Sequence, residues 1–325
     1  MLEIKTISAF LNLTLEQQTA IAKSLKSKER LEDWQRAVQA PDYQPPYPVE
    51  VRWVPCKCTK APPEDQGTCA ACGRPKHYGW KLNPAPVDER DNSGVHPSGL
   101  DKCAKHMWLS CTGESQKQEK FEQPRLRRIF DLGSCWHIAM QDWYGERGAW
   151  GDPRHYHKEV SIAFEAVNAD GTPVHPVATK YWIKGHCDAL LDPYITEVPG
   201  IGTVGVRVVH EYKTINSAGF AKLTGPQTKH IEQATTYAAC LDAPLTVYFY
   251  LNKDDSNLQD FVIPFAPKVW ETTIKKIEVV QAWVNGGKTP PWEHTSAILS
   301  PRECVECGYR RICQPPAQQM PNIRR

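Results

Sequence analysis

Residues 180–191 read KYWIKGHCDALL and residues 205–214 read GVRVVHEYKT, and these two stretches indicate the fold. Both are short apolar runs with the composition of a buried strand. A carboxylate inside such a run, as at Asp188, is costly to bury unless another group compensates its charge. Because strand residues two apart share a face, Glu211 and Lys213 point the same way. If the two strands pair, we expect Asp188 to meet them.

The neighbouring segments extend this pair into a mixed sheet. A Pro/Gly-rich connection between the two strands predicts a hairpin, and a helix over 226–241 predicts a crossover to a strand at 245–251. We therefore expect the α/β class, with a mixed β-sheet flanked by helices. The other expected elements are a strand at 160–167, a helix capped by Ser98, helices at 124–144 and 267–284, and N-terminal helices within 8–39, the second opened by a capping box at Thr14–Gln17.

Composition separates three segments along the 325 residues. We expect an N-terminal helical segment at 1–45, a Cys-, Pro- and Gly-rich module at 46–97, and a large α/β core at 98–325. Net charge is only +2, so binding of nucleic acid would need a local basic groove, for which the run at 123–128 is a small candidate. No segment resembles a membrane span or a secretion signal, which predicts a cytoplasmic protein without a membrane partner.

In a cytoplasmic protein the twelve cysteines are not expected to form disulfides. Three of them, Cys304, Cys307 and Cys313, follow the core at the spacing of cluster ligands, and Cys103 before the core is the best fourth. Four thiolates suit a [4Fe–4S] cluster that clasps the two ends of the core together. The alternative is a zinc site with the same four cysteines.

A second set of four cysteines lies in the loop-rich module, within seventeen residues. Its spacing matches a structural tetrahedral Zn²⁺ site, and a small segment of this composition needs such a metal to fold. His77 is a possible replacement ligand. The expected zinc ligands are Cys56, Cys58, Cys69 and Cys72.

The acidic residues of the two strands predict a site for a hard cation. Asp188, Glu211 and a backbone carbonyl, expected to be that of Tyr212, make an oxygen site that suits Mg²⁺ or Mn²⁺. Such an ion polarises a phosphate and lowers the pKa of a bound water, and Lys213 would orient that water or stabilise developing charge. The plainer alternative is a buried acid–lysine pair at the end of the sheet.

Further polar residues flank this cluster. His137 on the 124–144 helix is a candidate Mn²⁺ ligand, although a single helical histidine is more often structural. Gln233 and Tyr237 are four residues apart on one helix face, where they can bond phosphate and stack on a base. Glu159 and Glu165 are weaker candidates for assisting the metal.

The order His, Gly-x-x-Asp, Glu-x-Lys and Gln-x3-Tyr resembles the RecB-like branch of the PD-(D/E)xK nucleases. The Cys-x2-Cys-x5-Cys tail resembles its iron–sulfur subgroup, which includes CRISPR-adaptation and AddB-type nucleases. The resemblance covers about residues 98–315. It implies a restriction-endonuclease-like fold and metal binding by His137, Asp188, Glu211 and the Tyr212 carbonyl. It further implies catalysis by Lys213, with Gln233 and Tyr237 supporting the site or the DNA.

The expected function is thus a Mg²⁺- or Mn²⁺-dependent deoxyribonuclease, an exonuclease that acts on single-stranded or frayed DNA ends. Its expected partners are DNA and proteins of recombination, repair or CRISPR adaptation. One alternative is a non-catalytic protein that binds DNA ends within a larger complex. The four intact residues His137, Asp188, Glu211 and Lys213 argue against that alternative, because a pure binder needs no such set. Another is a DNA endonuclease.

Overall fold

The computed structural model describes residues 1–25, 51–53, 78–80, 94–113, 124–146, 152–288, 307 and 309–313. Contacts divide the chain into two compact units, one of residues 1–43 with 91–325 and one of residues 44–90. In the smaller unit, β2 (Val51–Trp53) pairs antiparallel with β3 (Tyr78–Trp80). The four cysteines of the expected zinc site lie outside the described residues.

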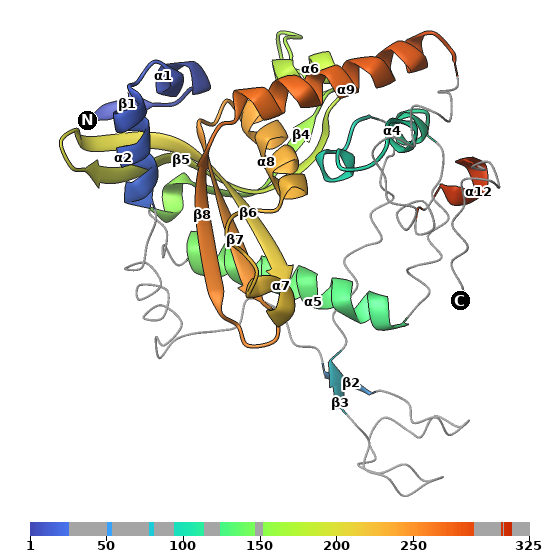
Figure 1. Ribbon diagram of the computed structural model, residues 1–325, viewed down its shortest axis with the longest axis horizontal. Helices are drawn as coiled ribbons and strands as arrows, with labels where there is room; N and C mark the ends of the chain where they lie inside the picture. The colour runs from blue at the N-terminus through green and yellow to red at the C-terminus, as the bar shows by residue number, and fades with distance from the viewer. Residues whose placement is uncertain are drawn as a thin grey trace, which may run out of the picture. The chain divides into compact units, whose positions relative to one another are not determined.

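The larger unit is built on a mixed sheet of six strands (Figure 1). Along the sheet run β4 (Tyr156–Ala163), β5 (Lys184–Val198), β6 (Gly202–Ile215), β7 (Leu245–Asn252) and β8 (Leu258–Pro264), and β1 (Leu2–Ile4) also pairs with β6. Both β1 and β7 lie parallel to β6, and the other pairs are antiparallel. The expected mixed sheet, the hairpin and the crossover are confirmed.

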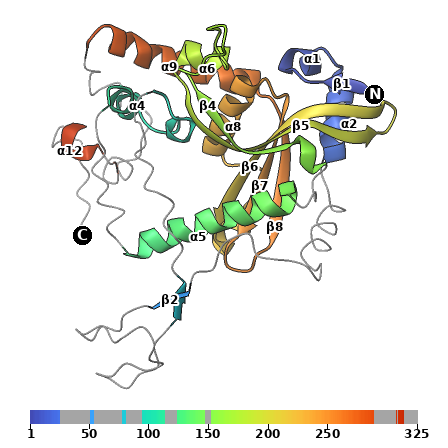
Figure 2. The same ribbon diagram turned by 180° about the vertical axis from the view of Figure 1, so that it is seen from behind.

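Helices cover both faces of this sheet. The crossover helix α8 (Thr228–Leu241) packs on β6 and β7, with α9 (Pro267–Asn285) outside it. On the opposite face lies α5 (Pro124–Gln141), seen in front of the strands in Figure 2. It continues as a π-helical turn, η3 (Asp142–Glu146). The remaining helical elements are α1 (Ile7–Leu11), α2 (Leu15–Leu25), η1 (Pro97–Gly99), α4 (Ala104–Cys111), η4 (Pro153–His155), α6 (Pro176–Tyr181), α7 (Ser217–Phe220) and α12 (Arg310–Cys313).

The two faces of the sheet bury different side chains. Towards α8 and α9 an aliphatic core contains Ile162, Ile183, Val209, Ile277 and Val280, all fully buried. Towards α5 and η3 the sheet carries an aromatic layer, in which rings contact one another edge-on or stacked. Its members are Tyr144, Tyr156, His210, Tyr212 and Phe249.

The N-terminal capping box is confirmed. Thr14 N–H donates to the Gln17 amide oxygen at 3.0 Å, and Gln17 N–H donates to the Thr14 hydroxyl at 3.2 Å. These reciprocal bonds satisfy two backbone N–H groups at the start of α2. Such groups have no acceptor within the helix, because no helical turn precedes them. The N-terminal helices are short and belong to the same unit as the sheet, since β1 pairs with β6 and α2 packs on β5 and β8.

Several expected boundaries were wrong. Ser98 caps no α-helix: it lies in η1, and α4 begins later, with the Cys103 thiol accepting the His106 N–H at 3.3 Å. The strand expected from Lys180 begins at Lys184, because Pro176 starts a short helix that ends at Trp182 in a left-handed conformation. The strand expected at 160–167 runs over Tyr156–Ala163.

Four strands were not expected: β1 and β8 in the larger unit, and β2 and β3 in the smaller one. The basic run at 123–128 enters α5, and its side chains lie outside the described ones. Within the described residues, no helix combines the length and the apolar character needed to cross a membrane.

Candidate active site

The acidic residues meet where β5 and β6 separate. The paired ladder begins at Ala189 opposite His210, one step beyond Asp188. Beyond the last ladder pair, the Asp188 carboxylate accepts a hydrogen bond from the Tyr212 N–H at 2.7 Å. A side chain therefore satisfies the backbone donor that the parting strands leave without a carbonyl. This contact places Asp188 beside Glu211, as the strand patterns predicted.

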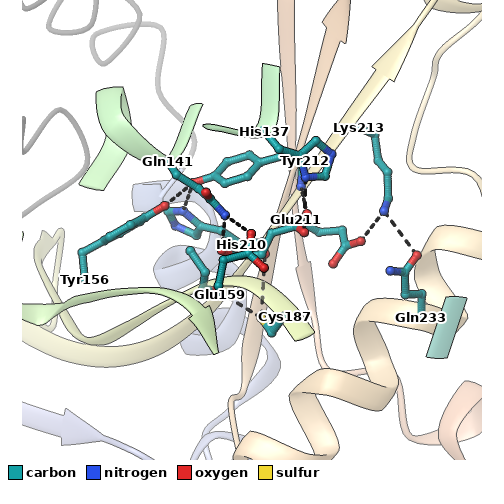
Figure 3. Close-up of polar contacts among 12 residues, drawn as sticks. His137, Gln141, Tyr156, Glu159, Cys187, His210, Glu211, Tyr212, Lys213 and Gln233 are labelled. Carbon is teal, nitrogen blue, oxygen red and sulfur yellow. Dashed lines mark hydrogen bonds and ion pairs between the residues drawn. The ribbon is translucent and has the colours of Figure 1, made fainter. Parts of the chain in front are cut away.

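Glu211 and Lys213 share a face, and their side chains form an ion pair. The Lys213 ammonium also donates to the amide oxygen of Gln233, 3.2 Å away on α8 (Figure 3). Glu211 is fully buried, whereas 18% of the Lys213 side chain is exposed. The lysine thus links the sheet to α8 and keeps an edge open to solvent.

His137 reaches the cluster from the other face of the sheet. Its Nδ1 lies 3.4 Å from an Asp188 carboxylate oxygen, and its side chain is 30% exposed. Asp188 is therefore held between a helix of one layer and the backbone of β6. The structure brings His137, Asp188, Glu211, Lys213 and Gln233 together from positions far apart in the sequence.

Each charge in the cluster shifts the pKa of its neighbours. Burial alone would raise the pKa of Asp188, but His137, Lys213 and the Tyr212 N–H together lower it. Burial raises the pKa of Glu211 to about 7, although Lys213 opposes that shift. Burial alone would lower the pKa of His137 and of Lys213, and the two carboxylates raise both. The site combines ionised groups with one carboxyl whose pKa lies near neutrality.

One oxygen of Glu211 lacks a hydrogen-bond partner among the described residues. Its Oε1 meets Lys213, but its Oε2 is buried and contacts no hydrogen-bond donor among the described residues. A buried carboxylate oxygen is costly to leave unpaired, so a cation is a suitable missing partner. With Asp188 and His137 it offers the oxygen and imidazole donors that Mg²⁺ and Mn²⁺ accept. In the described part of the chain, however, no three His, Cys, Asp or Glu side chains gather closely enough to hold an ion.

Gly185 explains how Tyr237 enters the site. A Cβ at Gly185 would lie 3.2 Å from the Tyr237 hydroxyl and 3.2 Å from Pro97, tighter than an ordinary contact. The absence of a side chain in β5 therefore lets the phenol approach the strand. Tyr237 is almost fully buried, and Gln233 lies one turn before it on α8. In the Gly-x-x-Asp pattern, the glycine makes room for Tyr237 and the aspartate, three residues later, supplies a carboxylate of the site.

The Tyr212 side chain points away from this cluster. Its hydroxyl contacts the Tyr156 hydroxyl at 2.9 Å and His210 Nδ1 at 3.1 Å, within the aromatic layer. The expected metal ligand is the backbone carbonyl of Tyr212 and not its side chain, so metal binding by that carbonyl stays a prediction. Glu165 pairs with Lys184 at 3.3 Å on the surface.

Sequence reasoning missed Gln141 as a site residue. The Gln141 amide nitrogen donates to the Glu159 carboxylate at 2.5 Å and to the Asp188 carbonyl at 2.9 Å. A glutamine at the end of a helix has no characteristic pattern. Its spacing of four from His137, which puts both on one helix face, is the signal that could have found it.

The C-terminal segment that contains Cys307 and Cys313 contacts the helix that follows Cys103. Tyr309, between Cys307 and Cys313, is fully buried, with its ring 4.8 Å from that of His106 on α4. Cys103 is buried at the start of the same helix. Cys304 lies outside the described residues.

No family model and no curated protein matches the chain. Among solved structures, the crystal structure of SSO0001 overlaps 70% of this chain and 89% of its own, at 16% identity and a TM-score of 0.39. An alkaline exonuclease (LHK-Exo) from Laribacter hongkongensis overlaps 61% of this chain and 90% of its own, at 13% identity and a TM-score of 0.36. Similarities this low establish neither a shared fold nor a shared activity.

Proposed function

We propose that this chain is a metal-dependent deoxyribonuclease that hydrolyses phosphodiester bonds as an exonuclease on single-stranded or frayed DNA ends. The observation that carries this proposal is the cluster of Asp188, Glu211 and Lys213. Two carboxylates and a lysine meet there, beside a buried glutamate oxygen that lacks a donor among the described residues.

His137, Asp188 and Glu211 would hold the divalent cation, with the Tyr212 carbonyl as a fourth ligand, after the side chains move closer together than they lie in the ion-free protein. When bound, the cation polarises the scissile phosphate and lowers the pKa of water. The ion-free protein balances its two carboxylates with His137 and Lys213 instead. A bound divalent cation would take over part of the charge compensation that His137 and Lys213 provide.

Lys213 is the proposed catalytic residue. Its ammonium, tethered by Gln233 and partly open to solvent, can orient the attacking water and stabilise charge that develops on the phosphate oxygens. The water oxygen bonds to phosphorus and the ester P–O bond breaks. One proton of the water is transferred, through solvent, to the leaving oxygen, and the other stays on the new phosphate group or passes to solvent. Gln233 holds the lysine, and Tyr237 supports the site or the DNA.

The first test replaces Lys213 by methionine, which keeps the stem and removes the charge. We expect cleavage of end-labelled single-stranded DNA with Mn²⁺ to fall about 100- to 1,000-fold, as for other charge-stabilising groups. DNA binding, measured by fluorescence anisotropy, should persist. Lys268→Met, at an exposed position of α9, is the control. Cleavage that persists in Lys213→Met would overturn the catalytic role of Lys213, and DNA binding without cleavage by the wild type itself would favour the non-catalytic DNA-end-binding protein.

The mode of cleavage needs a separate substrate. An exonuclease requires an end, so linear DNA should be shortened while closed circular DNA of the same sequence stays intact. Cutting of the circle at a comparable rate would indicate the endonuclease instead.

We further propose that Cys103, Cys304, Cys307 and Cys313 hold a [4Fe–4S] cluster, and that Cys56, Cys58, Cys69 and Cys72 hold Zn²⁺. The contact of Tyr309 with His106 supports the first set, because it joins the tail to the helix that begins after Cys103. Anaerobic purification should yield about four irons and one zinc per chain. Two zincs and no iron would overturn the cluster.

A further inference from the structure

Gln141 has a buried side chain at the end of α5, and both hydrogens of its amide are engaged. The amide nitrogen donates to the Glu159 carboxylate at 2.5 Å (Figure 3). It also donates to the Asp188 carbonyl at 2.9 Å. A glutamine amide has two donors, so this nitrogen is saturated by two acceptors from different strands. The side chain therefore joins β4, α5 and β5 at one residue of the site.

Glu159 occupies an irregular position in β4. Lys158 pairs with Ala189 and Val160 pairs with Cys187, so the register is the same on both sides of Glu159, which stands opposite Asp188 without forming a ladder pair with it. Its φ of 50° is in the left-handed region, which is unfavourable for a residue with a side chain. The residue is exposed and could be solvated by water, yet its carboxylate accepts from a buried amide. Such local strain is common where a fold holds a functional group.

Asp188 is thereby held at both its ends. His137 and Gln141 are four residues apart on α5 and share a face, the first contacting the Asp188 carboxylate and the second its carbonyl. The Tyr212 N–H fixes the carboxylate from β6. A change in the Asp188 peptide plane would move the carboxylate, so the amide contact controls where that carboxylate points.

We infer that Gln141 and Glu159 are positioning residues that hold Asp188 in the geometry for binding a divalent cation, an inference that rests on the proposed function. Glu159 acts by accepting from Gln141, and Gln141 acts on the Asp188 backbone. Partners behind metal ligands characteristically contribute about 10- to 100-fold in metal affinity.

The test is Mn²⁺ binding to the full chain by titration calorimetry, without DNA. Gln141→Met should weaken binding at least about ten-fold, because it keeps the side-chain volume and removes the donor. Glu159→Ala should weaken it similarly, and this exposed position tests the inference even if Gln141→Met fails to fold. Glu159→Gln should bind like the wild type, since its amide oxygen still accepts from Gln141. Gln281→Met is the control, because Gln281 also donates to a backbone carbonyl, that of Lys180 at 3.0 Å.

Wild-type affinity in Glu159→Ala, or in folded Gln141→Met, would overturn the inference. So would equal losses in Glu159→Gln and Glu159→Ala, because Glu159 would then bind the ion through its charge. Absence of Mn²⁺ binding by the wild type would also overturn it. A wild type that binds Mn²⁺ but cuts no DNA would instead refute the proposed function and leave the positioning role standing.

Discussion

Glu211 is the residue whose protonation most affects the site. It is fully buried, and burial raises the pKa of its carboxyl to about 7 despite the adjacent Lys213. At neutral pH the residue therefore lies between its two charge states. A divalent cation at this position would favour the ionised form, so metal binding and deprotonation of Glu211 should be linked.

This shift predicts how stability varies with pH in the metal-free protein. The unfolded carboxyl ionises near 4.5 and the folded one near 7, so the folded protein holds an extra proton between these values. Stability from this group is therefore lost as pH rises through that interval. The raised pKa of His137 acts in the same direction above 6.5. Glu211→Gln should flatten the decline in the free energy of unfolding between about pH 5 and about pH 8.

Urea unfolding with EDTA measures this decline. The comparison is the change in slope between wild type and Glu211→Gln, which also removes the contribution of Glu211 to the raised pKa of His137. A slope that Glu211→Gln leaves unaltered would mean that the carboxyl is ionised throughout.

At the residue scale, the alternation of side chains along a strand predicted which residues share a face of the sheet. The expected pairing of two strands predicted which residues lie opposite each other. That is why Glu211, Lys213 and Asp188 could be placed together from the sequence. Gln141 was missed: its spacing of four from His137 indicates a shared helix face, but its partners depend on the rotation of α5 and on the left-handed backbone at Glu159. Neither leaves a pattern in the amino-acid order.

At the element scale, Gly185 lets β5 approach α8 and η1. We expect Gly185→Ala to destabilise the protein by about 1–3 kcal/mol, because the added Cβ crowds Tyr237 and Pro97 at 3.2 Å. Gly205→Ala is the matched strand control, since its Cβ would meet Pro193 at an ordinary 3.5 Å. Urea unfolding of both variants measures the difference. Equal stabilities would mean that Tyr237 moves aside without cost.

The capping box makes a second prediction about an element. Thr14→Ala should cost about 1 kcal/mol, because it leaves the Gln17 N–H without its acceptor at the start of α2. Thr19→Ala, on the same helix, removes a hydroxyl that only donates to the Leu15 carbonyl and should cost much less. Thermal unfolding should show this order, and a reversed order would contradict it.

Elements with local signals were predicted best. The capping box depends on four adjacent residues, and the hairpin and the crossover join elements that follow one another along the chain. The short parallel strand β1 depends on pairing with β6, whose partner residues are some two hundred positions away. The error at Lys180 has a local cause, since Pro176 begins a helix inside an apolar run that reads equally well as a strand.

At the scale of the whole molecule, one strand organises the larger unit. The first part of β6 pairs with β1 and its second part with β7, while β5 lies along its other side. The N-terminal helices are attached to the sheet by this arrangement rather than forming a segment of their own. Amino-acid composition could not predict this attachment, because residues 1–25 and the strands that they contact differ in composition.

The C-terminal tail is joined to the beginning of the core through Tyr309. If the proposed cluster draws thiolates from both segments, the buried contact of Tyr309 with His106 must keep the tail beside α4. Tyr309→Ala should then lower the iron content per chain after anaerobic purification. Ile312→Ala is the matched control on α12, because that side chain is 48% exposed and should leave iron unchanged. Full iron content in Tyr309→Ala would mean that the cysteines alone hold the two segments together, and that the aromatic contact follows from the cluster rather than supporting it.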